Sequence, residues 1–271
     1  MKYQSIQPPD ILKPYVRYFW SLETSAEDPV QKNFRTIVDG CPGLIFQQNN
    51  KGAFYKDDQR LPETFLFGQS TKHAELNLSG NLGVTGIYFY PNVLKTVFGL
   101  NAEDLTDSCV DADSLVRSCN FHLSEQLANT SSITTQIQIL SSYLLSHVDK
   151  NRKREDEIMQ YALSQMVQSK GAISLNKLQE QLQLSERMLE RRFKQYVGIS
   201  PKLFSRICRF QSSLKQLRNN DYNKLSDIAF EHEYADQSHF IRSFKEFAGF
   251  FPYQYRKKSN EIVENFTELI K

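Results

Sequence analysis

The sequence predicts an α+β protein of two domains, a β-rich one followed by an all-α one. The length, 271 residues, is about twice that of a usual single domain. Short aromatic and β-branched runs fill residues 15–90, whereas the apolar spacing after Pro91 is helical. The charge divides in the same way. Residues 1–150 carry 12 Lys and Arg against 16 Asp and Glu, and residues 151–271 carry 21 against 15. We therefore place the two domains at 1–150 and 151–271.

The runs of the first domain are typical of an antiparallel sheet or barrel. YVRYFWSLE, LIFQQ and LGVTGIYFY have strand length and are bounded by Gly, Pro, Asn and Asp. Near the end of this domain, apolar residues recur at steps of three and four: Ile133, Ile137, Leu140, Leu144 and Val148. The stripe predicts a helix that packs either on its own domain or against a second copy in a homodimer. We assign the charged tract that follows, residues 149–156, as the linker, although a solvated helix surface has the same composition.

Composition also limits the class of protein. No apolar run reaches the roughly 18 residues of a membrane span, and the first residues lack a signal-peptide core, so we expect a cytoplasmic protein without a membrane partner. Four cysteines stand far apart in the sequence: Cys41, Cys109, Cys119 and Cys208. Their spacing fits small buried side chains better than metal or redox sites. The histidines before residue 150 are scattered and no catalytic motif occurs, so we expect no enzyme, no metal and no cofactor.

A helix-turn-helix is predicted in AISLNKLQEQLQLSERMLERRFKQYVGISP. A helix with apolar spacing precedes a turn at Gln183 and Leu184, and Ser185 caps a second helix. Leu189 and Phe193 turn one face of that helix to the core. The opposite face carries charged residues at the same spacing: Arg187, Glu190, Arg191 and Lys194. Such a face suits the major groove of DNA, where Arg reads guanine edges and Lys meets phosphates.

The same design returns in LSDIAFEHEYADQSHFIRSFKEFAGFFP. The turn falls at Glu233 and Tyr234, Asp236 caps the second helix, and aromatic residues recur on its core face. The other face carries Gln237, Ser238, Ile241, Arg242 and Lys245. Because the units also end alike, in KQYVGISP and KEFAGFFP, they form an internal repeat, which we place at residues 173–198 and 225–249.

Between the units, residues 200–218 predict one long helix. Its apolar residues follow each other at steps of four, three, four and three: Leu203, Ile207, Phe210, Leu214 and Leu217. Such a helix packs on both units and fixes the separation of the two recognition helices, and successive major-groove faces lie about 34 Å apart. Residues 170–258 hold 17 basic and 9 acidic side chains, as expected of a surface that meets phosphate. We assign phosphate contacts to Lys194, Lys202, Arg206, Lys245 and Lys257.

These motifs resemble the AraC/XylS family of bacterial transcription regulators. DQSHFIRSFKEFAGFFPYQYR is similar to the family signature D-Q-S-H-F-x-R-x-F-K-x-x-x-G-x-x-P-x-x-Y-R, and LSERMLERRFKQYVGISP to the matching stretch of the first unit. The resemblance covers residues 155–256. The family often has Gly in each inter-helix turn where this chain has Gln183 and Glu233, so we expect turns that are strained or differently shaped, because a non-Gly residue at positive φ is uncommon.

The resemblance implies roles for the residues on the two exposed faces. The base-reading positions correspond to Arg187, Glu190 and Arg191 in the first unit and to Gln237, Ser238 and Arg242 in the second. Glu190 would accept a hydrogen bond from a cytosine amino group or pair with Arg187 or Lys194. Double-stranded DNA and RNA polymerase are the implied macromolecular partners.

The first domain resembles the sensor-type domains that precede such helix-turn-helix pairs, many of them cupin-like barrels with a small-molecule pocket. Aromatic candidates for the lining of an effector pocket are Trp20, Phe46, Phe67, Tyr88 and Tyr90. Taken singly, each of them fits a role in the sheet core better than a role in the pocket lining. An effector and a homodimer are therefore possible partners.

The expected function is that of a sequence-specific transcription regulator that responds to an effector. A ligand-independent architectural DNA-binding protein would have the same sequence features. A DNA-repair enzyme fused to the same module would need clustered cysteines, whereas Cys41 stands alone.

Overall fold

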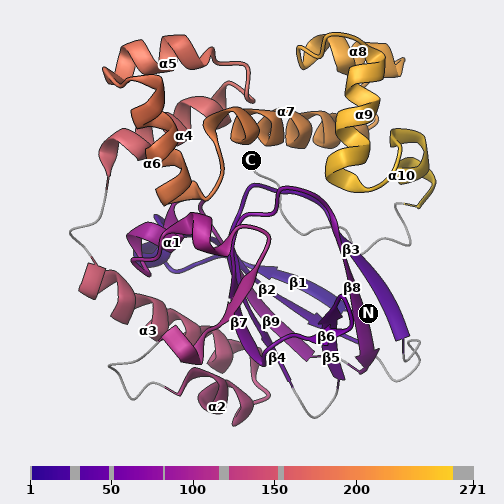
Figure 1. The fold of residues 1–271 in the computed structure, drawn as a ribbon. Helices are drawn as coiled ribbons and strands as arrows, with labels where there is room; N and C mark the ends of the chain where they lie inside the picture. The colour runs from indigo at the N-terminus through magenta and orange to yellow at the C-terminus, as the bar shows by residue number, and fades with distance from the viewer. Residues whose placement is uncertain are drawn as a thin grey trace.

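The computed structural model describes residues 2–24, 31–48, 52–81, 83–115, 122–151 and 156–258. A β-rich domain lies on one side and a helical domain on the other, with the long helix α7 across the top of the sheets (Figure 1). This two-domain α+β arrangement confirms the predicted fold class.

The strands of the β-rich domain form two antiparallel sheets. The six-stranded sheet runs β1 (Lys2–Ile6), β2 (Val16–Glu23), β9 (Gly83–Phe89), β4 (Gly43–Gln47), β7 (Thr64–Phe67) and β10 (Cys109–Asp111). The four-stranded sheet runs β3 (Gln31–Thr36), β8 (Ala74–Gly80), β5 (Gly52–Lys56) and β6 (Gln59–Arg60). As described, the strands make two open sheets and not the closed barrel that the sequence left possible.

Alternation along the strands assigns each side chain to one of two cores. In β4, Leu44 and Phe46 belong to a core shared with α3, whereas Ile45 faces the core that continues into the helical domain. The second of these cores joins Phe65 and Tyr88 of the sheets to Phe204 and Phe210 in the helices. The two domains thus share one apolar core.

Helices cover the outer face of the larger sheet and the edge toward the helical domain. They are the short helices η1 (Asp10–Leu12), α1 (Val93–Thr96), η2 (Ala102–Leu105), η3 (Asp113–Leu115) and α2 (Leu123–Ala128), and the longer α3 (Ile133–Asn151). On α3, Leu140, Tyr143 and Leu144 are buried, and Gln136 accepts a hydrogen bond of 2.5 Å from the Thr85 hydroxyl of β9. The apolar stripe of α3 therefore packs on its own domain, which was one of the two predicted arrangements.

The helical domain contains α4 (Glu157–Gln168), α5 (Leu175–Leu182), α6 (Glu186–Val197), α7 (Pro201–Arg218), α8 (Leu225–Glu231), α9 (Gln237–Ala248) and α10 (Pro252–Lys258). The pair α5–α6 lies within residues 173–198 and the pair α8–α9 within 225–249. Half of the predicted linker, residues 152–155, lies outside the described residues, so the domain boundary stays a prediction.

The joining helix α7 begins as the sequence predicts. The Ser200 hydroxyl accepts a hydrogen bond from the Leu203 amide at 3.2 Å, and Pro201 takes the first helical position, where its missing N–H costs nothing. Its predicted stripe is buried, apart from the partly buried Leu203. Within the described segments, no helix combines the length and apolarity that crossing a bilayer requires.

Candidate nucleic-acid interface

The first helix-turn-helix unit has the predicted turn and cap. Gln183 ends α5 in the left-handed conformation with φ 53°, as expected for a position where related chains have Gly. The Ser185 hydroxyl accepts a hydrogen bond of 3.3 Å from the Met188 amide, which confirms it as the N-cap of α6. Leu189 and Phe193 are fully buried, so the opposite side of α6 is turned outward.

The second unit repeats these devices with other side chains. Glu233 takes φ 54° in the turn, and the Asp236 carboxylate accepts a hydrogen bond of 2.6 Å from the His239 amide at the start of α9. Phe240, Phe244 and Phe247 are fully buried. The predicted cap and core face of α9 are therefore confirmed.

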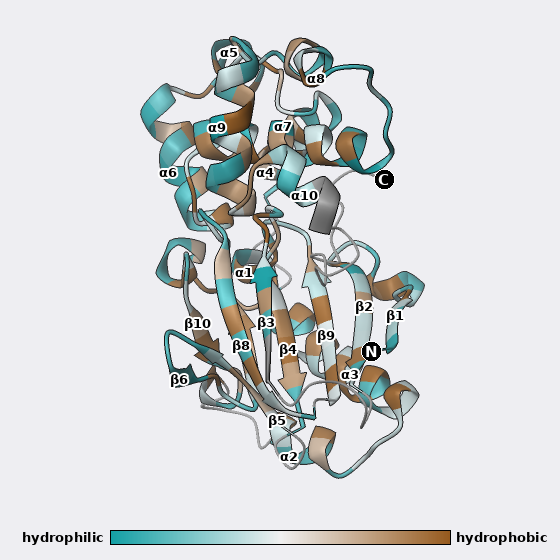
Figure 2. Cartoon of the chain, turned by 90° about the vertical axis from the view of Figure 1, so that its right-hand side faces the viewer, coloured by the Kyte–Doolittle hydropathy of each residue, from teal (hydrophilic) through white to brown (hydrophobic). Residues whose placement is uncertain are grey.

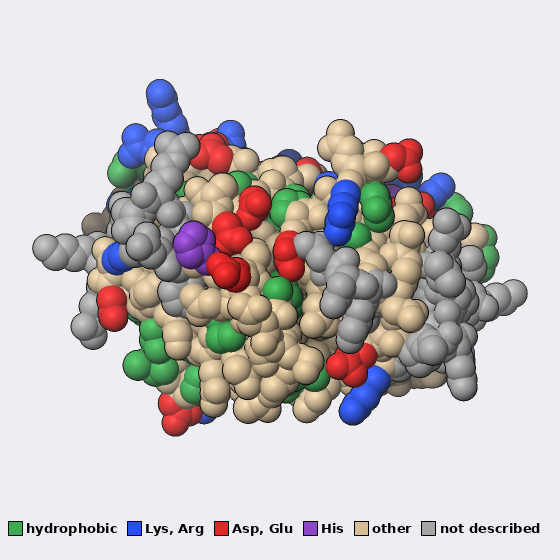
Figure 3. Space-filling view, turned by 90° about the horizontal axis from the view of Figure 1, so that it is seen from below, with side chains coloured by type: hydrophobic (Ala, Val, Ile, Leu, Met, Phe, Trp, Pro, Cys, Tyr) green, Lys and Arg blue, Asp and Glu red, His purple; other side chains and the backbone are tan. Residues whose placement is uncertain are grey.

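The predicted base-reading side chains are all exposed: Arg187, Glu190, Arg191, Gln237, Ser238 and Arg242. Within the described part of the chain, Glu190 makes no ion pair with Arg187 or Lys194. The outward sides of α5 and α6 are mostly hydrophilic (Figure 2). By contrast, acidic and basic side chains are interspersed on the far side of the β-rich domain (Figure 3).

The predicted phosphate contacts divide into three groups. Lys194, Lys202 and Lys245 are exposed, and the Lys245 ammonium lies 4.5 Å from the centre of the Phe251 ring. Arg206 is half-buried: it forms an ion pair of 2.5 Å with Glu246 and lies over a Phe ring of α9. That ion pair competes with a phosphate for the guanidinium. Lys257 lies in α10, but its side chain is outside the described residues.

An acidic residue of the β-rich domain, Glu103 of η2, borders the exposed charged face of α6. It lines a depression of about 340 Å³ together with five side chains of α6: Arg187, Met188, Glu190, Arg191 and Lys194. Its carboxylate adds negative charge beside the basic side chains of α6. Glu103 could not be predicted from the sequence, because no local pattern places residue 103 beside residue 190.

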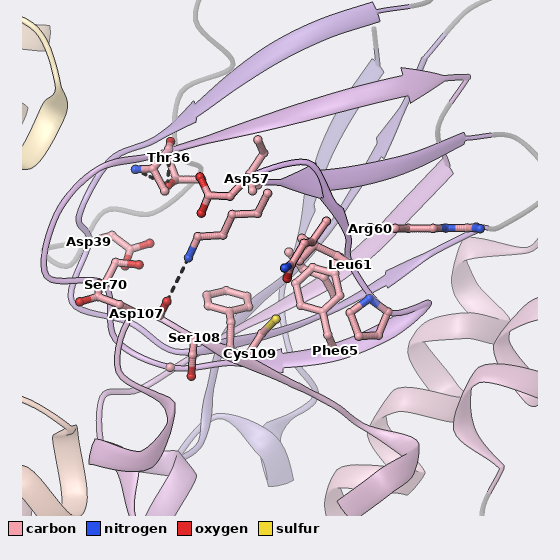
Figure 4. Close-up of a pocket in the computed structure, with 18 of the residues that line it drawn as sticks. Thr36, Asp39, Asp57, Arg60, Leu61, Phe65, Ser70, Asp107, Ser108 and Cys109 are labelled. Atoms are coloured by element: carbon pink, nitrogen blue, oxygen red, sulfur yellow. Dashed lines mark hydrogen bonds between the residues drawn. The ribbon is translucent and has the colours of Figure 1, made fainter.

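A cavity of about 520 Å³ lies in the β-rich domain (Figure 4). One end carries polar residues, among them Thr36, Asp39 and Ser70, and the other carries apolar ones such as Leu61 and Phe65. The Lys56 ammonium donates a hydrogen bond of 3.0 Å to the Asp107 carbonyl across the polar end. The lining therefore suits a small amphipathic molecule.

Only two of the five predicted aromatic lining residues, Phe67 and Tyr88, face this cavity. Trp20, Phe46 and Tyr90 do not line this cavity, so their role as effector contacts stays a prediction. The Trp20 ring stacks against Tyr88, with centroids 6.1 Å apart, and does not line the cavity. Phe46 faces the opposite core because side chains alternate along β4, and Tyr90, beyond the end of β9, is 40% exposed.

The described cysteines are not activated nucleophiles. Burial raises the pKa of Cys41 to about 12, and its sulfur accepts a hydrogen bond of 3.2 Å from Arg17. Burial also raises the pKa of Cys208 and of Cys109. Cys119 lies outside the described residues. Among the described residues, no three His, Cys, Asp or Glu side chains gather as metal ligands.

Two protein families match parts of this chain, and one of them agrees with the helix-turn-helix geometry described above. A family described as "Helix-turn-helix domain" matches residues 178–258. This chain carries an AraC-type helix-turn-helix domain. It is a DNA-binding transcription regulator. A second family, "Domain of unknown function (DUF6597)", matches residues 4–111, which hold nearly all strands of the β-rich domain. No curated protein matches the chain.

Three solved structures are similar to this chain. ToxT from Vibrio cholerae is 12% identical, with a TM-score of 0.45 over 94% of this chain and 98% of ToxT. The C-terminal domain of AraT, a response regulator from Geobacillus stearothermophilus, is 26% identical, with a TM-score of 0.36 over 42% of this chain and 93% of that domain. The AraC-like transcriptional activator CuxR is 11% identical, with a TM-score of 0.27 over 79% of this chain and 86% of CuxR.

Proposed function

We propose that the chain is a sequence-specific regulator that inserts α6 and α9 into successive major-groove segments of one duplex. The observation that carries this proposal is the repeated arrangement of two capped helices on one joining helix, each with a buried apolar face and an exposed polar face. An α-helix fits the major groove, where polar side chains distinguish all four base pairs.

Base reading is assigned to the exposed faces of the two helices. In the first unit Arg187 and Arg191 would read guanine edges, and Glu190 would accept from a cytosine amino group. In the second unit Arg242 would read guanine, while Gln237 and Ser238 supply shorter hydrogen-bonding groups. Phosphate contacts hold the register without reading sequence. The exposed ammonium groups of α6, α7 and α9 suit this role: Lys194, Lys202 and Lys245.

The cavity in the β-rich domain is the proposed effector site. Its volume of about 520 Å³ and its mixed lining suit a small molecule with an apolar body and a polar end. Two lining residues, Thr36 and Asp107, directly follow residues that contact the helical domain, Arg35 and Thr106. An effector bound there would therefore lie next to the contacts that hold the DNA-reading helices. Contact with RNA polymerase is proposed from the family resemblance alone.

The test is selection of bound genomic fragments by the full chain over a series of salt concentrations. We expect a motif with two segments about one helical turn apart and a steep loss of affinity with salt. Arg242→Ala should lose the preference at one base position, whereas Lys13→Ala, which removes an exposed lysine paired with Asp10 in the β-rich domain, should select the wild-type motif.

Two outcomes would contradict the proposal. Salt-sensitive binding without any motif would favour the architectural alternative. A motif that Arg242→Ala and Arg187→Ala both leave unchanged would remove the reading role from α6 and α9.

A further inference from the structure

The first recognition helix ends against the β-rich domain. Gly198, the C-cap of α6, has φ 93°, and its carbonyl accepts a hydrogen bond of 2.7 Å from the Thr106 hydroxyl. A methyl group on Gly198 would lie 2.8 Å from the Ala102 carbonyl oxygen, so the backbone of η2 and the end of α6 are in direct contact. Only glycine combines this conformation with this close approach.

The second recognition helix ends in the same way against another part of the β-rich domain. Gly249, the C-cap of α9, has φ 76°, and its carbonyl accepts a hydrogen bond of 3.2 Å from Arg35. The Arg35 guanidinium also pairs with Glu75 and lies 4.1 Å from the centre of the Phe250 ring. A methyl group on Gly249 would lie 2.5 Å from the His73 ring.

Backbone and histidine hydrogen bonds strengthen the contact at α9. The Val38 amide donates to the Phe247 carbonyl at 3.2 Å, and Nδ1 of His73 lies 3.0 Å from the Glu246 carbonyl oxygen. The joining helix is held beside them, because the Gln211 side-chain amide donates to the Val38 carbonyl at 2.5 Å. Each glycine that ends a repeat unit is thus both a helix cap and a docking point.

These contacts close a ring that consists of α6, α7, α9 and the β-rich domain. In a chain where α7 alone connected the two units, each unit could rock about its own contact with that helix. A second connection through the β-rich domain removes this freedom, because both recognition helices are then fixed at two points. Both docking contacts join residues that are far apart in the sequence. Thr106 is 92 residues from Gly198, and Arg35 is 214 residues from Gly249.

We propose that the β-rich domain sets the spacing at which the two recognition helices read DNA, with Thr106 and Arg35 as the positioning residues. The inference rests on the proposed two-helix reading. Neither residue would touch DNA: each acts through the carboxyl end of a recognition helix. Their loss should therefore change the preference for operator spacing and not the preference for individual bases.

The experiment compares the duplex recovered by selection with two duplexes in which the segments stand two base pairs closer or farther apart. Wild type should bind the altered duplexes about tenfold more weakly or worse, the scale of a mismatched site. The full-length double variant Thr106→Val and Arg35→Gln should bind the original duplex more weakly but lose less than about threefold on the altered ones. Thr106→Ser, which keeps the hydroxyl, should retain the wild-type ratio.

Two further measurements keep the outcome decisive. Lys13→Gln, which removes a surface ion pair away from the ring, controls for a general effect of lost charge. Amide hydrogen exchange in the last turns of α6 and α9 should be faster in the single and double variants than in wild type, and this readout needs no DNA.

An unchanged spacing ratio and unchanged exchange in the double variant would overturn the inference and leave the proposed function intact. A wild-type motif with a single segment would overturn the two-helix reading itself, and the spacing role with it. If the double variant does not fold, the Thr106→Val and Thr106→Ser pair decides between the same outcomes.

Discussion

The two helix-turn-helix units share their backbone devices and differ in their side chains. Both have a non-Gly residue in the left-handed conformation in the turn, at Gln183 and Glu233, and both end on a left-handed glycine. The cap of α6 is a hydroxyl and the cap of α9 a carboxylate. The backbone geometry is repeated where two helices must cross in one way, and the side chains vary where the neighbours and the DNA differ.

The cores of the two units differ most. Within the described part of the chain, Phe193 of the first unit contacts one aromatic ring, that of Phe204, at 6.1 Å between centroids. Phe244 of the second unit contacts three rings, those of Phe210, Phe240 and Tyr255, at 5.5 to 5.8 Å. Among the described residues, the aromatic cluster around Phe244 is thus larger than the one around Phe193.

The largest expected effect tests this difference in the cores. Phe244→Ala should lower the free energy of unfolding by about 3 to 5 kcal/mol, because a fully buried ring is lost. The three ring contacts add about 0.5 to 1.5 kcal/mol each beyond burial, so Phe193→Ala should cost less. Chemical denaturation of both variants measures the difference. Equal costs would show that the aromatic cluster has no special weight.

The next effect separates the two units in DNA reading. Arg242→Ala and Arg187→Ala should each weaken binding to the selected duplex by about 1 to 3 kcal/mol and relax one base position, each in a different segment of the motif. Lys202→Ala should weaken binding to all sequences alike and lower the salt dependence. Titration of single-base variants of the duplex distinguishes them. If both Arg variants relaxed the same segment, the assignment of one unit to each segment would be wrong.

A smaller effect is expected in the turns. Gln183→Gly and Glu233→Gly should raise the free energy of unfolding by about 0.5 to 1 kcal/mol, since glycine takes positive φ without the steric cost that other residues meet. Gln179→Gly, inside α5, should lower it by about 1 kcal/mol and serves as the control. Thermal unfolding of the three variants gives the comparison. A loss of stability at either turn would mean that its side chain makes a contact worth more than the strain.

The smallest effect is the pH dependence of stability that a histidine of the second unit contributes. His232, the C-cap of α8, is buried, and its Nε2–H donates a hydrogen bond of 2.8 Å to the Gln216 side chain. Burial lowers the pKa of His232 below its usual value near 6.5. The unfolded chain therefore takes up a proton first as the pH falls, and stability is lost below about pH 6.5.

Denaturation of wild type and His232→Gln at about pH 7.5 and pH 5.5 measures this contribution. The variant should lose less stability on acidification than wild type. His147→Gln on α3 removes a half-buried histidine whose pKa is also lowered by burial, and it should reduce the pH dependence through the β-rich domain instead. An equal pH dependence in wild type and His232→Gln would contradict the expected role of His232.

The helical domain is the part that the sequence predicts well. The caps at Ser185 and Asp236, the turns and the apolar stripes are set by residues within a few positions of each other, so their pattern is visible in one stretch. The strands of the β-rich domain were also expected from their composition. Their pairing was not, because Phe46 and Ile45 face different cores only once the sheets have formed.

The contacts between the two domains could not be predicted from local sequence patterns. Thr106 and Arg35 look like ordinary loop and strand residues, and their partners lie far along the chain. The glycines of the repeat gave the one available signal. Their match between units predicted two similar helix ends, but not that the first domain would bind both of them.

The buried surface of the joining helix α7 limits which insertions the protein can tolerate. α7 buries side chains all round, with Phe204 and Phe210 in the core, and Gln211 bonded to the β-rich domain. Each residue added to a helix advances it by about 1.5 Å and turns it by about 100°. If α6 and α9 read DNA as proposed, an insertion within α7 would therefore turn the exposed face of one of them away from the groove. The tolerated registers of α7 would then be discrete, and the operator preference would change through substitutions on the exposed faces of α6 and α9.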